Sequence, residues 1–145
     1  MQIEQLSIDN LTQLIELVLA LWEDCEFEEE FENYKDIIDS ENEICYLCKN
    51  QENYIAFIHV STRNDYVEGA VDLPVAYVEG IYVKPTYQKH GIAKKLMNVA
   101  EDWAKQKGYK QLASDTEITN TGSIDFHKKM GFTEVERIVC LIKDL

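Results

Sequence analysis

Apolar residues that recur three and four positions apart predict four helices. The first should begin after Asn10, a residue suited to cap it, and end near Trp22. The second runs through the acidic stretch 27–38, the third covers 92–104, and the fourth is a short helix at 123–130. Each helix has an apolar side that must pack against another part of the chain.

Runs rich in β-branched and aromatic residues predict six strands. They are Gln2–Leu6, Ile44–Lys49, Tyr54–Thr62, Val75–Val83, Leu112–Ser114 and Val135–Ile142. The polar residues 50–53 should join two of these strands as a hairpin. Residues 63–74 contain turn formers and no periodic pattern, and a connection of this length is a candidate functional segment.

The predicted order of elements is βααβββαβαβ. With 145 residues, 46% of them hydrophobic, and no repeat or linker, the chain is long enough to bury one substantial core and too short for two. We expect a single domain over residues 1–145 with a mixed α/β (α+β) fold.

The sequence does not predict a membrane protein. It has no run of about 18 apolar residues, and its first ten residues carry two acids and no Lys or Arg, unlike a secretory signal. We therefore expect a cytoplasmic location and no membrane partner.

Two of the four cysteines, Cys45 and Cys48, form a C-x-x-C pair, a spacing also found in redox and zinc sites. In a strand, however, residues three apart point to opposite faces, and no second ligand pair follows at zinc-like spacing. The three histidines, His59, His90 and His127, show no ligand spacing with the acids either. We expect buried, reduced thiols and no metal.

The formal net charge of −13 lies in the N-terminal third of the chain. Residues 1–45 hold 14 acidic side chains against one Lys, whereas residues 46–145 hold 13 of each sign. Such a field repels nucleic acid and favours a cationic substrate. Alternatively, the acidic stretch 23–32 is only a solvated helix face.

The connection at residues 88–93 has the features of an anion site. Its sequence, Gln-Lys-His-Gly-Ile-Ala, leads from a strand into the most amphipathic helix, and the first N–H groups and dipole of a helix attract a diphosphate. Gly91 and the small Ala93 would let the backbone approach this group closely. Four lysines within twelve residues add positive charge: Lys84, Lys89, Lys94 and Lys95.

This connection matches the pattern Q/R-x-x-G-x-G/A and resembles the pyrophosphate loop of the GNAT superfamily of acetyl-CoA-dependent N-acetyltransferases. The resemblance implies a central mixed, mostly antiparallel sheet with helices on both faces, split between its fourth and fifth strands. It also implies acetyl-CoA as cosubstrate and a strand N–H that stabilises the oxyanion. The residues that it assigns to coenzyme binding are Ile81, Tyr82, Val83, Gln88, Lys89, His90, Gly91, Ile92, Ala93, Lys94, Asn120 and Phe126.

A second segment supports this resemblance. The residues Asn120, Ser123, Phe126, His127, Gly131 and Phe132 are similar to the later GNAT pattern N-x-x-[AS]-x-x-[FL]-Y-x-x-x-G-F. His127 stands where many relatives carry a Tyr whose hydroxyl protonates the departing thiolate. The resemblance therefore assigns this catalytic role to His127 or to a water.

A narrower likeness concerns the acceptor. Residues 65–69, 74–85, 112–117 and 126–127 with 131–132 resemble one group of aminoglycoside 6′-N-acetyltransferases, which are antibiotic resistance enzymes. An aminoglycoside is a hydroxylated polycation, so its site needs carboxylates and flat aromatic faces. The positions that match the antibiotic contacts of this group are Trp22, Tyr66, Glu79, Asp115 and Glu136. The resemblance alone also implies a homodimer, formed through the C-terminal strand.

Acetyl transfer needs a neutral amine, so a catalytic group must take the ammonium proton. We expect Asp115 to position the ammonium and receive its proton, with Glu79 acting directly or through water. A carboxylate such as Glu79 in an apolar strand costs free energy unless it is paired or functional. Each site residue also has a structural alternative, such as core packing for Trp22 or loop anchoring for Tyr66. Two other functions remain open: acetylation of a polyamine or peptide amine, and a non-catalytic acyl-CoA sensor.

Overall fold

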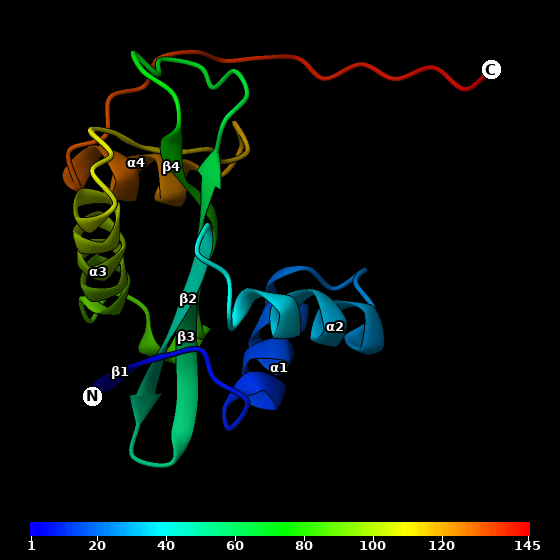
Figure 1. Ribbon diagram of the computed structural model, residues 1–145, viewed down its shortest axis with the longest axis vertical. Helices are drawn as coiled ribbons and strands as arrows, with labels where there is room; N and C mark the ends of the chain where they lie inside the picture. Colours follow the sequence, from blue (N-terminus) through cyan, green and yellow to red (C-terminus); the bar gives the residue numbers. More distant parts are fainter.

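The computed structural model describes residues 1–145, and its five strands form one sheet in the order β1-β2-β3-β4-β5. The strands are β1 (Gln2–Gln5), β2 (Glu43–Asn50), β3 (Asn53–Arg63), β4 (Val75–Val83) and β5 (Leu112–Ser114). The first four pair antiparallel, and β5 pairs parallel with β4. The long strands β2, β3 and β4 run through the middle of the molecule (Figure 1). The predicted mixed, mostly antiparallel sheet is confirmed.

Helices cover both faces of this sheet. They are α1 (Leu11–Leu21), α2 (Phe27–Ile37), α3 (Ile92–Gln106) and α4 (Thr121–Lys129), with a 3-10 turn, η1 (Pro85–Tyr87), before α3. Figure 1 shows α1 and α2 on one side of the sheet and α3 and α4 on the other. Phe57 packs in the core under α1, and the next residue, Ile58, packs in the core under α3. Successive residues of β3 thus pack against the helices on opposite faces of the sheet.

The C-x-x-C pair is part of this packing. Cys45 is buried in the core under α1, whereas Cys48 is buried in the core under α3, and neither forms a disulfide. Burial raises the pKa of both thiols, which makes them poor nucleophiles. The prediction of buried thiols on opposite faces is confirmed.

The sheet opens along β4. Strands β4 and β5 share three residue pairs, of which the last joins Val78 to Ser114. Beyond this pair β4 continues to Val83 and pairs only with β3 on its other side. The split predicted between the fourth and fifth strands is therefore present, and it leaves one edge of the second half of β4 without a strand partner.

A β-bulge lies where the split begins. His59 is opposite Gly80 and Val60 is opposite Val78, so Glu79 is an extra residue in β4. Bulges re-aim side chains and are frequent beside functional sites. Val78 packs in the core under α3, but the Glu79 carboxylate bonds to Ser61 and Gly80 faces Trp22 on the α1 side. The bulge thus turns Glu79 toward the α1 side of the split.

Two predictions of local structure were wrong. Residues 135–142 form no strand: segment 133–145 is exposed and extends away from the sheet (Figure 1). A run of β-forming residues becomes a strand only where it pairs with a neighbouring backbone, and segment 135–142 pairs with no strand of the single chain. The side chain of Asn10 does not cap α1; its Oδ1 instead accepts a hydrogen bond of 2.9 Å from the Ser7 N–H.

None of the four helices combines the length and the apolar character needed to cross a bilayer.

Candidate active site

The predicted phosphate-binding turn lies at the start of α3, next to the end of β4. Gly91 precedes the helix with φ of 80°, a left-handed conformation that favours glycine, and no side chain caps the first N–H groups. A β-carbon on Gly91 would meet nothing within 4 Å, so the space above the helix start is open. The amide of Gln88 bonds at 3.0 Å to the Val83 carbonyl and ties the turn to β4.

This geometry fits a bound diphosphate. Unpaired N–H groups at a helix start supply donors and a positive dipole end, and the exposed Lys84, Lys89 and Lys94 add charge. Ile81 and Tyr82 on the neighbouring half of β4 are partly exposed, whereas Val83 is buried. The chain therefore has a candidate anion site and a free strand edge close together, an arrangement that suits a long phosphorylated thioester.

Helix α4 lies on the same side of the sheet as α3. Asn120 caps it, because its Oδ1 accepts a hydrogen bond of 3.1 Å from the Ser123 N–H. Phe126 packs against the core under α3. Both residues thus have structural roles, and their contacts with a coenzyme stay predictions.

His127 is held by two hydrogen bonds. Its Nδ1 is 2.7 Å from the Ser123 carbonyl oxygen, which can only accept, so Nδ1 carries the proton. Its Nε2 is 2.8 Å from Ser114 Oγ and, in the neutral ring, accepts from that hydroxyl. Ser114 ends β5 at the split. His127 therefore reaches the split through Ser114, and it can donate from Nε2 only as an imidazolium.

Both oxygens of the Glu79 carboxylate accept hydrogen bonds from neighbouring side chains. Arg63 donates to it from Nε at 2.9 Å and from Nη2 at 2.8 Å, and the Ser61 hydroxyl donates at 2.6 Å. Burial opposes ionisation of Glu79, but the hydrogen bonds from Arg63 and Ser61 and the charge of Arg63 outweigh it, so its pKa is lowered. The expected cost of a carboxylate in this strand is thus offset by a bidentate ion pair.

Arg63 also links Glu79 to Asp115. The guanidinium carbon of Arg63 is 3.5 Å from the centroid of the Tyr77 ring, and the Tyr77 hydroxyl donates a hydrogen bond to the Asp115 carboxylate. Burial and this hydrogen bond raise the pKa of Tyr77, which therefore stays a donor. The two acids predicted for catalysis are brought into one network.

The aromatic candidates differ in how firmly they are placed. The Trp22 ring lies against Gly80 and meets Phe57 edge-on at 6.4 Å between centroids. Tyr66 is 77% exposed on loop 64–74. Glu136 is exposed on the C-terminal segment, and no contact joins it to Glu79 or Asp115. Trp22 and the two acids thus lie close together around Glu79, while the roles of all five candidates in substrate binding stay predictions.

Four polar residues of this region escaped prediction: Ser61, Arg63, Tyr77 and His59. His59 lies 2.9 Å from Glu43 through Nε2 and 3.3 Å from the Tyr34 hydroxyl through Nδ1. Positions 59, 61 and 63 alternate along β3, which is a signal that they share a face. What the sequence alone does not show is that this face meets Glu79, because the pairing register and the bulge decide it.

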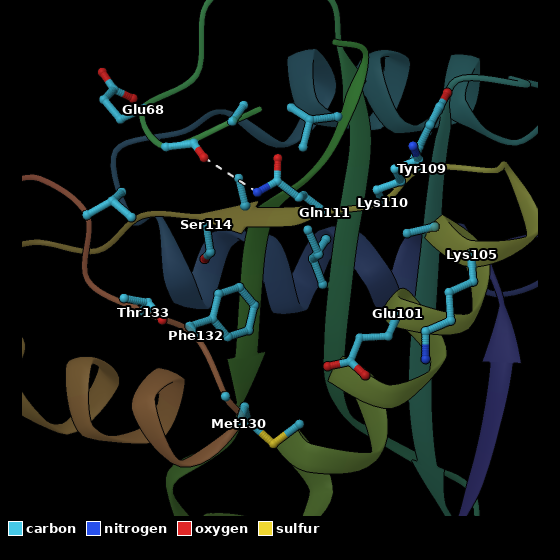
Figure 2. A pocket seen from close by; sticks show the side chains of 18 residues that line it. Glu68, Glu101, Lys105, Tyr109, Lys110, Gln111, Ser114, Met130, Phe132 and Thr133 are labelled. Atoms are coloured by element: carbon cyan, nitrogen blue, oxygen red, sulfur yellow. Dashed lines mark hydrogen bonds between the residues drawn. The ribbon is translucent and has the colours of Figure 1, made fainter. Parts of the chain in front are cut away.

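A groove of about 410 Å³ follows the outer edge of β5. Figure 2 shows Gln111, which directly precedes β5, and Ser114, which ends it, on the groove wall together with Met130 and Phe132. Gln111 closes one end, since its amide bonds to Gly69 and Val71 of loop 64–74. The groove thus lies beside the only unpaired edge of the parallel part of the sheet.

Comparison with known proteins agrees with this geometry. The model of the acetyltransferase (GNAT) family matches residues 11–132. The chain is 36% identical to the aminoglycoside N(6')-acetyltransferase type 1 of Serratia marcescens over 138 residues, covering 94% of each protein. It is 33% identical to the enzyme of the same name from Acinetobacter haemolyticus, over 100% of this chain and 99% of the relative.

Solved structures agree as well. The chain superimposes on AAC(6')-Iy in complex with the bisubstrate analogue CoA-S-monomethyl-acetylneamine, with a TM-score of 0.94, 30% identity and coverage of 99% of this chain and 98% of that one. On the apo AAC(6')-IG of Acinetobacter haemolyticus the TM-score is 0.91 at 31% identity, covering 100% and 99% of the two chains. The chain belongs to the GNAT acetyltransferase family and, within it, to the aminoglycoside 6′-N-acetyltransferases of type 1.

Proposed function

We propose that this protein transfers the acetyl group of acetyl-CoA to the 6′-amino group of aminoglycoside antibiotics and thereby confers resistance. The observation that carries this proposal is the arrangement along β4: an open helix start follows its carboxyl end, and two acids, Glu79 and Asp115, lie with the rings of Trp22 and Tyr77 near the bulge at its middle. A relative with 30% identity binds an analogue that joins coenzyme A to acetylneamine, which supports the same pairing of ligands.

The donor site is the turn 88–93 together with the free edge of β4. The N–H groups at the start of α3 hold the pyrophosphate, and the exposed lysines around the turn neutralise it. The backbone groups of Ile81, Tyr82 and Val83 align the pantetheine arm. When bound, acetyl-CoA supplies an activated acyl group that an amine can attack directly.

The acceptor site uses charge and flat surfaces. Trp22 and Tyr66 pack against sugar rings, while Asp115, Glu79 and Glu136 bind ammonium groups. Glu79 is a poor proton acceptor because its pKa is lowered, so its role is to orient the amine. Asp115 keeps one oxygen free of the Tyr77 hydrogen bond and receives the amine proton. Placing amine and thioester together accounts for much of the acceleration.

His127 acts on the thiolate side. Through the Ser114 hydroxyl it reaches the split between β4 and β5, where the sulfur of the coenzyme would lie. As an imidazolium it can return a proton to the departing thiolate, the role that a Tyr plays in many relatives.

The functional unit is a homodimer built with the C-terminal segment. Segment 133–145 carries exposed Ile138, Val139, Leu141 and Ile142, and an extended apolar segment of this kind needs a sheet edge. The groove along the outer edge of β5 offers one. A partner's segment laid in this groove would complete the sixth strand and bring its Glu136 toward an acceptor site. The cytoplasm, where acetyl-CoA is available, is the proposed location.

Thiol release from acetyl-CoA tests this function. Purified protein would be assayed with kanamycin and tobramycin beside spermidine, and the acetylated nitrogen located by NMR. We expect kcat/KM for tobramycin to exceed that for spermidine by at least about tenfold, with modification at the 6′-nitrogen. Faster turnover of spermidine would instead make the protein a polyamine acetyltransferase, and absence of thiol release with every amine would make it a sensor.

A further inference from the structure

Arg63 is a fixed cation inside a site built to receive a cation. It ends β3, and its side chain runs over the Tyr77 ring to make a bidentate ion pair with Glu79. The side chain is 40% exposed and that of Glu79 is 27% exposed, so both are accessible to solvent rather than enclosed in the core. None of the antibiotic contacts implied by the family resemblance includes this residue.

This ion pair changes what Glu79 can do. A free carboxylate beside an amine stabilises the ammonium form, which has no lone pair and cannot attack a thioester. The Arg63 charge, at hydrogen-bond distance from both carboxylate oxygens, cancels most of this effect. The carboxylate oxygens have further lone pairs, so Glu79 can still accept a hydrogen bond from an amine or a sugar hydroxyl.

We propose that Arg63 is a positioning residue for acetyl transfer: it fixes and neutralises Glu79, so that this carboxylate orients the acceptor amine without trapping it as unreactive ammonium. This role presupposes the proposed function, because it concerns the amine that attacks the thioester. It assigns Glu79 to orientation and leaves Asp115 as the carboxylate that takes the proton.

The other charged and titratable groups around the pair come from four elements. His59 lies on β3 near Glu79, with Glu43 of β2 and Tyr34 of α2 bonded to its ring. Tyr77 and Asp115 complete the surroundings of Arg63. Because none of these groups donates to Glu79, removing Arg63 leaves only the Ser61 hydroxyl on this carboxylate.

The pH dependence of kcat tests this role. In the enzyme–substrate complex, kcat rises with pH as the bound amine loses its proton. Replacing Arg63 by Gln leaves Glu79 uncompensated, so the rising limb should move up by about one pH unit, and kcat at pH 7 should fall about tenfold. The KM for tobramycin should stay equal or decrease, because a carboxylate has been freed for ammonium binding.

Two further variants separate charge from shape. Arg63→Lys keeps the charge and should keep the limb within about 0.3 pH unit of wild type, although it loses the bidentate geometry. The double variant Arg63→Gln/Glu79→Gln removes both charges and should return the limb toward wild type, even if Arg63→Gln alone is too unstable to assay. Lys49→Gln, which removes a distant lysine beside Glu4, serves as the matched control and should leave the profile unchanged.

The results separate this role from the function itself. The wild-type rate with tobramycin decides the function; should spermidine prove the better acceptor, the same shift must appear with spermidine. If kcat of Arg63→Gln rises over the same pH range as that of the wild type, whether or not KM increases, the proposed role is wrong and Arg63 is only a structural or binding residue. Affinity for coenzyme A, measured by calorimetry, should stay at the wild-type value in all variants.

Discussion

The ring of Trp22 occupies the space that a side chain on Gly80 would need: a β-carbon there would lie 2.5 Å from Cη2 of the indole. Gly80 follows the bulged residue Glu79, so the close approach of backbone and ring holds Trp22 beside this carboxylate, at one side of the proposed acceptor site.

Gly80→Ala should therefore displace Trp22. We expect a KM for tobramycin raised at least about tenfold and a lower melting temperature, because an over-packed contact costs about 1–3 kcal/mol. Steady-state kinetics and thermal unfolding check this. Gly122→Ala in α4, where a β-carbon has room, is the control: it should leave the KM for tobramycin unchanged and should not lower the melting temperature, because Ala is favoured over Gly in a helix. Unaltered antibiotic kinetics in Gly80→Ala would exclude Trp22 from the site.

Gly91 tests the proposed coenzyme site, and Gly108 is its matched control. Both have φ near 80° and open space where a β-carbon would stand, so Ala costs about 1–2 kcal/mol of conformational strain at either position. Only Gly91 faces the proposed pyrophosphate. Isothermal calorimetry should show coenzyme A affinity reduced about tenfold or more in Gly91→Ala and unchanged in Gly108→Ala. Equal losses in the two variants would attribute the effect to stability alone.

The ion pair of Glu79 predicts a pH dependence of stability. Its folded-state pKa is lower than the ordinary value of 4.5, so its stabilising contribution is complete above that value and disappears as the pH falls through the folded pKa. Melting temperatures should therefore differ between wild type and Glu79→Gln by a few degrees at pH 7, and the difference should shrink below about pH 4. If the difference in melting temperature between wild type and Glu79→Gln stays constant down to pH 3, the ion pair with Arg63 does not stabilise the fold.

His127 is predicted to act on kcat. His127→Gln should lower kcat about tenfold to a hundredfold and leave the KM for both substrates within about twofold, because general-acid catalysis operates on the transition state. His127→Tyr, which places a phenol at the position, should recover most of the rate. If kcat of His127→Gln equals that of the wild type, the proton comes from water and His127 only anchors α4 to β5.

The C-terminal segment is predicted to carry the dimer. Changing both Ile138 and Val139 to Asp should convert the protein to a monomer in light scattering coupled to size-exclusion chromatography, since charges cannot be buried in an apolar groove. In the monomer the KM for the antibiotic should rise, because Glu136 no longer lies beside the acceptor site of the partner. The affinity for coenzyme A should stay at the wild-type value. Asp144→Asn, at the end of the same segment, is the control. A dimer that persists in the double variant would place the interface elsewhere.

Local patterns were enough to predict most of the fold. Strand β4 and strand β5 have the predicted bounds, because each is a short run of β-forming residues between turn signals. The turn at Gly91 was also identified, since its chemistry lies in contiguous residues. Asn10 and segment 135–142 were predicted incorrectly for a common reason: both depend on which backbone is nearby, and that is a tertiary property.

The polar network around Glu79 was only half predicted for the same reason. Glu79 and Asp115 could be found as acids in or after apolar strands, but Arg63 and Tyr77 look ordinary along the sequence. Their importance comes from the register that sets Ser61 opposite Tyr77 and from a bulge that shifts everything after it by one residue. The residues of one strand do not determine its pairing register, because the register also depends on the partner strand.

The single inserted residue in β4, Glu79, also separates the strand into two halves with different neighbours. On one side of it lie loop 64–74 and Arg63, beside the proposed acceptor site; on the other lie Ile81 to Val83 and the turn at Gly91, where we propose that the donor binds. Mutations that reshape the loop or the end of α1 can thus alter which antibiotics are modified while the machinery for the acyl donor is left intact. A resistance enzyme built this way can widen its range one loop substitution at a time.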